Sequence, residues 1–224
     1  MTSVSSTDSL QSSLGYRFKA LALLDEALTH SSLVNEQKTA LPQHNERLEF
    51  LGDAVLSLVM SEYLASTLPQ SSEGTLSKLK AQVVSEASLA QVARRLGLGE
   101  HLKLGRGEDR SKGREKDSLL ADALEAVLAA VHLDGGYEAS RMVTRHIFSE
   151  ELTQIAAQQD QPGAGDYKTQ LQEWCQKRHD TLPRYATVRE TGPDHQKLFE
   201  VELSIQGEVV GVGSGRSKKE AEQQ

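Results

Sequence analysis

Apolar residues recur at intervals of three and four along most of the first two thirds of the chain. Between residues 18 and 158 this spacing is typical of amphipathic helices. Glycine or proline interrupts the pattern near Pro42, near Pro69, at residues 97–99 and at residues 135–136. The sequence therefore predicts that this part of the chain is all α-helical.

A polar segment separates this helical part from the rest of the chain. Residues 156–166 (AAQQDQPGAGD) have no apolar period and contain proline and glycine, which is typical of a flexible linker. We therefore expect a first domain over residues 9–155, a linker over residues 156–165 and a second domain over residues 166–224.

The apolar period changes to two beyond this linker. In residues 198–206 apolar and polar residues alternate, as in a half-buried antiparallel strand, and residues 184–191 and 208–213 are the expected partner strands. A helix over residues 167–177 precedes them, and a capping box at Ser217 begins another. The expected fold class is thus an all-α domain followed by a small α-β-β-β-α domain whose last helix is truncated.

The first group of acidic residues lies on a helix that we expect to run from Asn45, as its N-cap, to about Ala65. On a helical wheel Glu46, Glu49 and Asp53 lie within about 60° of one another. Taken alone, such a group is most simply the solvated flank of a surface helix. The positions that the wheel turns toward the core are Leu48, Leu51, Val55, Leu58 and Val59.

A second helix changes that interpretation. Residues 118–133 (SLLADALEAVLAAVHL) are apolar or small on almost every side, which predicts a buried helix. Asp122 and Glu125 are its two acids, and their spacing of three places them on one face. Burying unpaired carboxylates costs several kcal/mol each, so these two must be protonated, paired or bound to metal. No Lys or Arg within the segment can pair with them.

Packing the two helices together would gather four carboxylates: Glu49, Asp53, Asp122 and Glu125. Oxygen ligands alone suit Mg²⁺ or Mn²⁺ and do not suit zinc. A di-iron bundle is the main alternative, but it requires Glu-x-x-His pairs, which neither helix has. Phosphodiester hydrolysis with Mg²⁺ is therefore the favoured chemistry. The six histidines considered, His30, His44, His101, His132, His146 and His179, show no ligand spacing and are interpreted as structural.

Charge and cysteine content limit the class of protein. The formal net charge of −7 argues against a nucleic-acid partner when only the total is considered. Basic residues are nevertheless concentrated in residues 103–116 and again at Arg216, Lys218 and Lys219. The single cysteine, Cys175, excludes an intramolecular disulfide, so we expect a cytoplasmic protein. No apolar run approaches the ~20 residues of a membrane span, so we expect no membrane partner.

Several segments resemble the ribonuclease III family. Residues 45–56 (NERLEFLGDAVL) are similar to its signature motif, and residues 14–18 (LGYRF), 27–31 (ALTHS) and 118–126 (SLLADALEA) match further motifs in the same order. The tail resembles the family's double-stranded RNA-binding domain. The segments that carry this second resemblance are residues 167–174 (YKTQLQEW), 192–195 (GPDH) and 213–223 (GSGRSKKEAEQ).

The resemblance implies an endonuclease that cuts both strands of double-stranded RNA as a homodimer, with Mg²⁺, or Mn²⁺ in its place, as cofactor. It implies 5′-phosphate and 3′-hydroxyl ends with short 3′ overhangs, and a role in rRNA and mRNA processing. Phe50 would be the dimer anchor, and Glu46 would lie near the scissile phosphate. The metal ligands would be Glu49, Asp53, Asp122 and Glu125, and the catalytic residues Asp53, Glu125 and Glu46.

In the tail, the resemblance implies RNA contacts by six residues. The two lysines fit this role physically, because cations in the first turn of a helix oppose its dipole unless a phosphate binds there. The six residues are Thr169, Gln172 and Glu173 in one minor groove, His195 in a neighbouring groove, and Lys218 and Lys219 at the phosphates.

The alternative function is that of a double-stranded RNA-binding protein that does not cut RNA. The complete set of four acids argues against this alternative.

Overall fold

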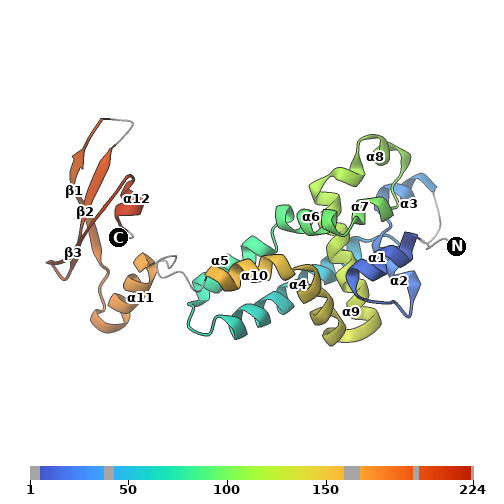
Figure 1. Ribbon diagram of the computed structural model, residues 1–224, viewed down its shortest axis with the longest axis horizontal. Helices are drawn as coiled ribbons and strands as arrows, with labels where there is room; N and C mark the ends of the chain where they lie inside the picture. The colour runs from blue at the N-terminus through green and yellow to red at the C-terminus, as the bar shows by residue number, and fades with distance from the viewer. Residues whose placement is uncertain (1–5, 38–42, 159–166, 194–196, 223–224) are drawn as a thin grey trace. The chain divides into compact units, whose positions relative to one another are not determined.

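The computed structural model describes residues 6–37, 43–158, 167–193 and 197–222. By contact density the chain divides into two compact units, residues 1–160 and 161–224. The predicted break near Pro42 and most of the predicted linker lie outside the described residues. The expected fold class is confirmed, because helices form the described part of the first unit and a three-stranded sheet with helices forms the second (Figure 1).

Two features of the sequence explain the helices of the first unit. Ser72 and Ser85 begin helices by accepting the main-chain N–H of the residue three positions later, at 3.3 and 3.4 Å. Gly136, at φ 76°, interrupts the longest helix, as its sequence predicts. The helices are α1 (Ser6–Leu14), α2 (Leu21–Ala27), α3 (Ser31–Gln37), α4 (Glu46–Thr67), α5 (Glu73–Val83), α6 (Glu86–Arg95), α7 (Leu98–His101), α8 (Arg106–Arg110), the 3₁₀ helix η1 (Gly113–Glu115), α9 (Asp117–Ile147) and α10 (Ser149–Gln158).

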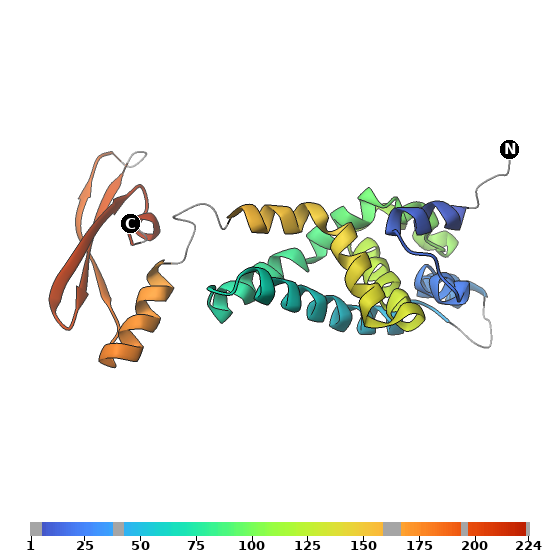
Figure 2. The same ribbon diagram turned by 60° about the horizontal axis from the view of Figure 1, so that its bottom comes forward.

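Helix α9 is the centre of the first unit. It packs against α2, α4 and α6, and α4 lies beside it (Figure 2). As predicted, its first half is buried on almost every side, and the alanines allow other helices to approach closely. The buried residues of that half are Leu120, Ala121, Ala123, Leu124, Ala126, Val127, Leu128, Ala129, Ala130 and Val131.

The expected N-cap role of Asn45 is wrong. Asn45 has helical backbone angles, φ −70° and ψ −16°, and its side chain makes no capping hydrogen bond. A capping side chain requires an extended backbone at that residue. Asn45 is instead buried, and its main-chain N–H donates to the Thr29 carbonyl oxygen at 2.9 Å, which fixes the start of α4 through a long-range contact.

The core-facing stripe expected for α4 is partly wrong. Leu48, Val55 and Val59 are buried, but Leu58 is 56% exposed. The buried stripe continues through Leu56 and Met60 instead. The stripe is rotated because α4 meets α9 through the face that carries Gly52, a residue that an apolar wheel does not count.

The second unit contains the predicted antiparallel sheet in the order β1-β2-β3. A tight turn at Gln206 and Gly207, both at positive φ, joins β2 to β3. The predicted cap at Ser217 is confirmed, since its Oγ accepts the Glu220 N–H at 3.1 Å. The elements are α11 (Tyr167–His179), β1 (Arg184–Thr191), β2 (Leu198–Ile205), β3 (Glu208–Gly215) and the four-residue α12 (Lys218–Ala221). In the described segments of both units, no helix combines the length and the apolar character needed to span a bilayer.

Candidate active site

The candidate site is built where α4 crosses α9 at the backbone of Gly52. A Cβ atom on Gly52 would lie 2.0 Å from the main-chain oxygen of Glu125 and 2.4 Å from its carbonyl carbon. No side chain fits in that space, so the two helices are in backbone contact. The contact brings Glu49 and Asp53, which flank Gly52 on α4, next to Asp122 and Glu125 on α9.

The electrostatics of these acids reflect their proximity. The pKa of Glu125 is raised to about 7, first by burial and then by the negative charges of Asp53, Glu49 and Asp122, in that order. The pKa of Glu49 is also raised, first by burial, then by Asp122 and Glu46. The structure therefore places the four predicted ligands within electrostatic reach of one another, on the two predicted helices.

The four carboxylates have no cationic partner among the described residues. There, the side chains of Glu49, Asp53, Asp122 and Glu125 form no hydrogen bond or ion pair. Asp53 is exposed and the other three are half-buried, so the group is open to solvent on one side. Like-charged carboxylates without partners are unfavourable, and a bound divalent cation would remove that cost.

The donor chemistry of the cluster fits a hard divalent cation, because every ligand atom is a carboxylate oxygen. In the described part of the chain, no three His, Cys, Asp or Glu side chains converge on one point. Among the described residues, the four carboxylates therefore match such a cation by their chemistry and not by a preformed ligand geometry.

Glu46 lies at the exposed start of α4, at the edge of this cluster. Its Oε2 is 3.8 Å from Nδ1 of His44, and its charge contributes to the raised pKa of Glu49. It is therefore close enough to the cluster to influence it, while its own carboxylate faces solvent.

Two residues beside Asp122 were missed by sequence reasoning. Burial raises the pKa of the Asp122 carboxyl, the negative charge of Glu86 raises it further, and His30 lowers it. Glu86 lies in the first turn of α6, and no pattern in the sequence connects it with α9. His30 lies in the ALTHS segment, which resembles a motif of the ribonuclease III family. The sequence spacing of His30 is not that of a metal ligand, so the sequence predicts a structural role for it.

Phe50, the dimer anchor that the resemblance implies, is 83% exposed on α4. A single exposed phenylalanine is by itself an ordinary feature of a protein surface. Leu58, on the same helix, adds a second exposed apolar side chain.

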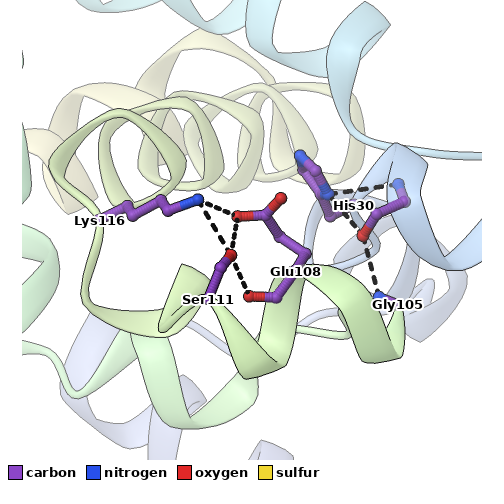
Figure 3. A network of polar contacts seen from close by, with 6 residues as sticks. His30, Gly105, Glu108, Ser111 and Lys116 are labelled. Atoms are coloured by element: carbon purple, nitrogen blue, oxygen red, sulfur yellow. Dashed lines mark hydrogen bonds and ion pairs between the residues drawn. The ribbon is translucent and has the colours of Figure 1, made fainter.

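Three of the six basic residues in the segment 103–116 form ion pairs with acidic residues of the same domain. Arg114 Nε lies 2.7 Å from Asp109 Oδ1, and Lys103 pairs with Asp25. Lys116 Nζ lies 2.5 Å from Glu108 Oε1 (Figure 3). At least these three cations stabilise the local fold, which weakens the case for this segment as a free basic surface.

The predicted RNA-contacting residues are only partly described. Lys218 Nζ lies 3.1 Å from Glu190 Oε1 and 5.6 Å from the centroid of the Phe199 ring, so it is exposed but paired. Gln172 is half-buried on α11. Thr169, Glu173 and Lys219 lie in helices, but their side chains are outside the described part of the chain, as is the whole of His195.

Comparisons with known proteins identify two domain families in the chain. A family model described as Ribonuclease-III-like matches residues 21–151, and one described as Double-stranded RNA binding motif matches residues 167–224. The nuclease domain of Ribonuclease III from Campylobacter jejuni is 42% identical, with a TM-score of 0.60, over 64% of this chain and 96% of that one.

Curated relatives extend the similarity over nearly the whole chain. Ribonuclease 3 of Natranaerobius thermophilus is 49% identical over 201 residues, which are 90% of this chain and 85% of the relative. Ribonuclease 3 of Heliobacterium modesticaldum is 51% identical over 211 residues, 94% of this chain and 88% of the relative. With its acidic cluster on α4 and α9 and its two matching domain families, this chain belongs to the ribonuclease III family.

Proposed function

We propose that the chain hydrolyses both strands of double-stranded RNA at a Mg²⁺ site formed by Glu49, Asp53, Asp122 and Glu125. Membership of the ribonuclease III family, together with the double-stranded RNA binding motif, makes it an endoribonuclease of double-stranded RNA. The observation that carries the assignment of the site is the backbone contact between Gly52 and Glu125. That contact gathers four carboxylates that have no cationic partner among the described residues.

The four carboxylates would hold the cation, and Mn²⁺ would substitute for Mg²⁺ because both prefer oxygen ligands. When bound there, the ion activates water for attack on the phosphodiester and stabilises the leaving oxygen. Glu125 must be ionised to act as a ligand. Its pKa of about 7 means that cation binding near neutral pH competes with a proton on this carboxyl.

The remaining acids have distinct positions around the cluster. Asp53 is exposed, so it can contribute a carboxylate where RNA approaches the site. Glu46 lies at the rim, where it would orient groups around the scissile phosphate. We extend the proposal to the products that the sequence resemblance implied, namely 5′-phosphate and 3′-hydroxyl ends with short 3′ overhangs.

We further propose that the enzyme acts as a homodimer anchored by Phe50. The 83% exposure of this aromatic ring on the same helix as Glu49 and Asp53 supports the assignment, because large exposed aromatics are typical interface anchors. A solved structure of the Campylobacter jejuni nuclease domain is described as having a region involved in dimer formation.

The second domain would bring RNA to the first. We place the first domain at residues 9–155, the linker at residues 156–165 and the second domain at residues 166–224. The proposed RNA contacts of the second domain are those named above on α11, at residues 192–195 and on α12. The single cysteine supports a cytoplasmic enzyme, and rRNA and mRNA precursors are the proposed substrates.

A cleavage assay tests this function against the alternative of a protein that binds but does not cut. The purified chain is incubated with a labelled RNA duplex in Mg²⁺, in Mn²⁺ and in EDTA. We expect short products with 5′-phosphate ends in both metals and none in EDTA. Binding without products in either metal, with the chain folded, would instead support the non-cleaving alternative.

A further inference from the structure

Three segments of the second unit meet at one end of its sheet. Glu190, near the end of β1, is paired with Phe199 of β2, and Phe199 is paired on its other side with Gly215, the last residue of β3. Neighbouring strands of a sheet lie about 4.8 Å apart, so these three residues form a row across the sheet. The chain continues from Gly215 to the cap of α12 at Ser217.

Helix α12 is held directly over this row. A Cβ atom on Gly215 would lie 2.6 Å from the main-chain nitrogen of Ala221 and 2.8 Å from the Cβ of Glu220. The Arg216 N–H donates to Glu220 Oε2 at 2.7 Å, which ties the chain before the helix to its first turn. Lys218, the first residue of α12, therefore starts from a fixed position beside the sheet.

The Lys218 side chain lies against the row and is paired with its acid. Lys218 Nζ is 3.1 Å from Glu190 Oε1 and 5.6 Å from the centroid of the Phe199 ring. Both charged side chains remain accessible, since 57% of Lys218 and 43% of Glu190 are exposed. Water screens an exposed ion pair, so it contributes little to stability. Another anion can therefore displace Glu190 from Lys218 at a small cost.

The pair affects any phosphate that approaches Lys218, one of the two α12 lysines with a proposed phosphate contact. The phosphate must displace the Glu190 carboxylate or share the ammonium group with it, and the two anions repel each other. Residues 166–224 contain nine basic and ten acidic side chains. The second domain thus has no general excess of positive charge that would compensate for a lysine engaged by an acid.

We propose that Glu190 limits the affinity of the enzyme for double-stranded RNA by competing with RNA phosphates for Lys218. This inference rests on the proposed phosphate contact of Lys218. Glu190 is not among the six residues for which the sequence resemblance implied an RNA contact, and it acts on RNA through the lysine. Its carboxylate keeps binding by the second domain weak, so that cut RNA dissociates readily.

The competition predicts a distinct dependence on salt. A lysine that neutralises a phosphate releases the salt cation held there, and in duplex DNA each such contact steepens the fall of log affinity with log salt by about 0.9. When Lys218 exchanges Glu190 for a phosphate, the freed carboxylate attracts a salt cation again. The exchange therefore contributes less than a full contact. Removing the carboxylate should raise affinity and steepen the salt dependence together, and a merely structural role for Glu190 would do neither.

The test measures binding of the full-length chain to an RNA duplex of about 20 base pairs, which exceeds the span of about 16 of one such domain. EDTA is present so that the RNA is not cut. Glu190→Gln removes the charge and keeps the size of the side chain. The matched control, Glu208→Gln, removes the same charge about 20 Å away, because Glu208 pairs with Ile205 at the other end of β2. Lys218→Ala and the double variant Glu190→Gln/Lys218→Ala complete the cycle.

Affinity is measured by fluorescence anisotropy across a salt series, and thermal unfolding is recorded for every variant. We expect Glu190→Gln to bind about two- to fivefold more tightly at about 0.1 M salt, with a slope steeper by up to about 0.9. Glu208→Gln should change affinity by less than about 1.5-fold, because salt screens a charge at that distance. Lys218→Ala should bind more weakly, and in its background Glu190→Gln should have no further effect.

Two results would overturn the proposal. One is an affinity of Glu190→Gln that is unchanged or lower while Lys218→Ala weakens binding, which would show that the acid does not compete. The other is an equal gain in Glu208→Gln, or a gain that persists in the Lys218→Ala background, which would show a general effect of net charge. If Lys218→Ala binds RNA like the wild type, the proposed phosphate contact is itself wrong, and the competition is excluded with it.

Discussion

Gly52 on α4 faces the main-chain carbonyl of Glu125 on α9 so closely that a Cβ atom on residue 52 would lie 2.0 Å from the oxygen. This contact sets the separation of the two helices that carry the candidate ligands. Glycine inside a helix costs about 1 kcal/mol relative to alanine. Here it permits a geometry that alanine cannot adopt.

Gly52→Ala should therefore destabilise the first domain by about 3 kcal/mol and abolish cleavage, because the new methyl group forces α4 away from α9. Denaturation monitored by circular dichroism and a cleavage assay measure the two effects. The matched control is Gly74→Ala on α5, where a Cβ would meet only Ser72 Oγ at 3.9 Å. That variant should keep its activity and gain up to about 1 kcal/mol of stability. A Gly52→Ala variant with normal stability would contradict the close contact.

Glu125→Gln should leave the fold and RNA binding near those of the wild type but reduce Mg²⁺-dependent cleavage by more than about 100-fold. The reason is that a neutral amide is a poor ligand in a site that requires negative charge. Cleavage rates and duplex binding are measured on the same preparation. Glu62→Gln, on the same helix as Glu49 but outside the cluster, is the control and should cut normally. Substantial cleavage by Glu125→Gln in Mg²⁺ would refute the assignment of the site.

The raised pKa of Glu125 predicts how stability without metal depends on pH. A carboxyl whose pKa rises from 4.5 to about 7 on folding favours the folded state most below pH 4.5, and this contribution is lost as pH rises through 7. Glu49 and Asp122, also raised, act in the same direction. In EDTA the melting temperature should therefore fall between pH 5 and about pH 8.

Glu125→Gln should flatten this pH dependence, since the amide does not titrate, and Mg²⁺ should reduce it in the wild type. Carboxyls with lowered pKa, such as Asp134, have the opposite sign, but their effect appears as pH falls below their ordinary range near 4. Identical melting curves for wild type and variant across this pH range in EDTA would show that the Glu125 proton is not linked to folding.

Phe50→Ala should weaken dimerisation by about tenfold or more, because it removes a large exposed aromatic anchor from the proposed interface. Sedimentation equilibrium at low micromolar concentration measures the change. Leu21→Ala removes an apolar side chain that is also more than half exposed, but at the start of α2, and should leave the dimer intact. An unchanged dimer in Phe50→Ala would remove this residue from the interface.

A fragment of residues 1–155 should retain cleavage at low salt, because all four proposed ligands precede the linker. It should lose activity at lower salt concentration than the full chain does, since the second domain's phosphate contacts are absent and the remaining electrostatic binding weakens steeply with salt. Replacing Lys218 and Lys219 with alanine in the full chain should shift its salt dependence part of the way, without moving the cut site. Cleavage is compared across a salt series. A folded, dimeric fragment that is inactive even at low salt would place part of the chemistry beyond the linker.

The sequence alone determined the fold class and the two helices of the site. Apolar residues spaced three to four apart in helices, and two apart in strands, follow directly from helix and strand geometry. These spacings can therefore be recognised in the sequence without knowledge of the tertiary contacts. Asp122 and Glu125 were identifiable because acids are costly in a helix that is otherwise apolar. The signature segment at residues 45–56 added the family and the roles of its residues.

The tertiary structure decided how these helices meet and which residues lie behind the acids. The wheel placed Leu58 in the core, because periodicity counts apolar side chains and cannot register a helix contact made by the backbone at Gly52. Asn45 was assigned as a cap, but a hydrogen bond from its main chain to distant Thr29 fixes the helix start. Glu86 and His30 approach Asp122 from other helices and loops, and such long-range proximity follows from packing, which no local pattern in the chain encodes.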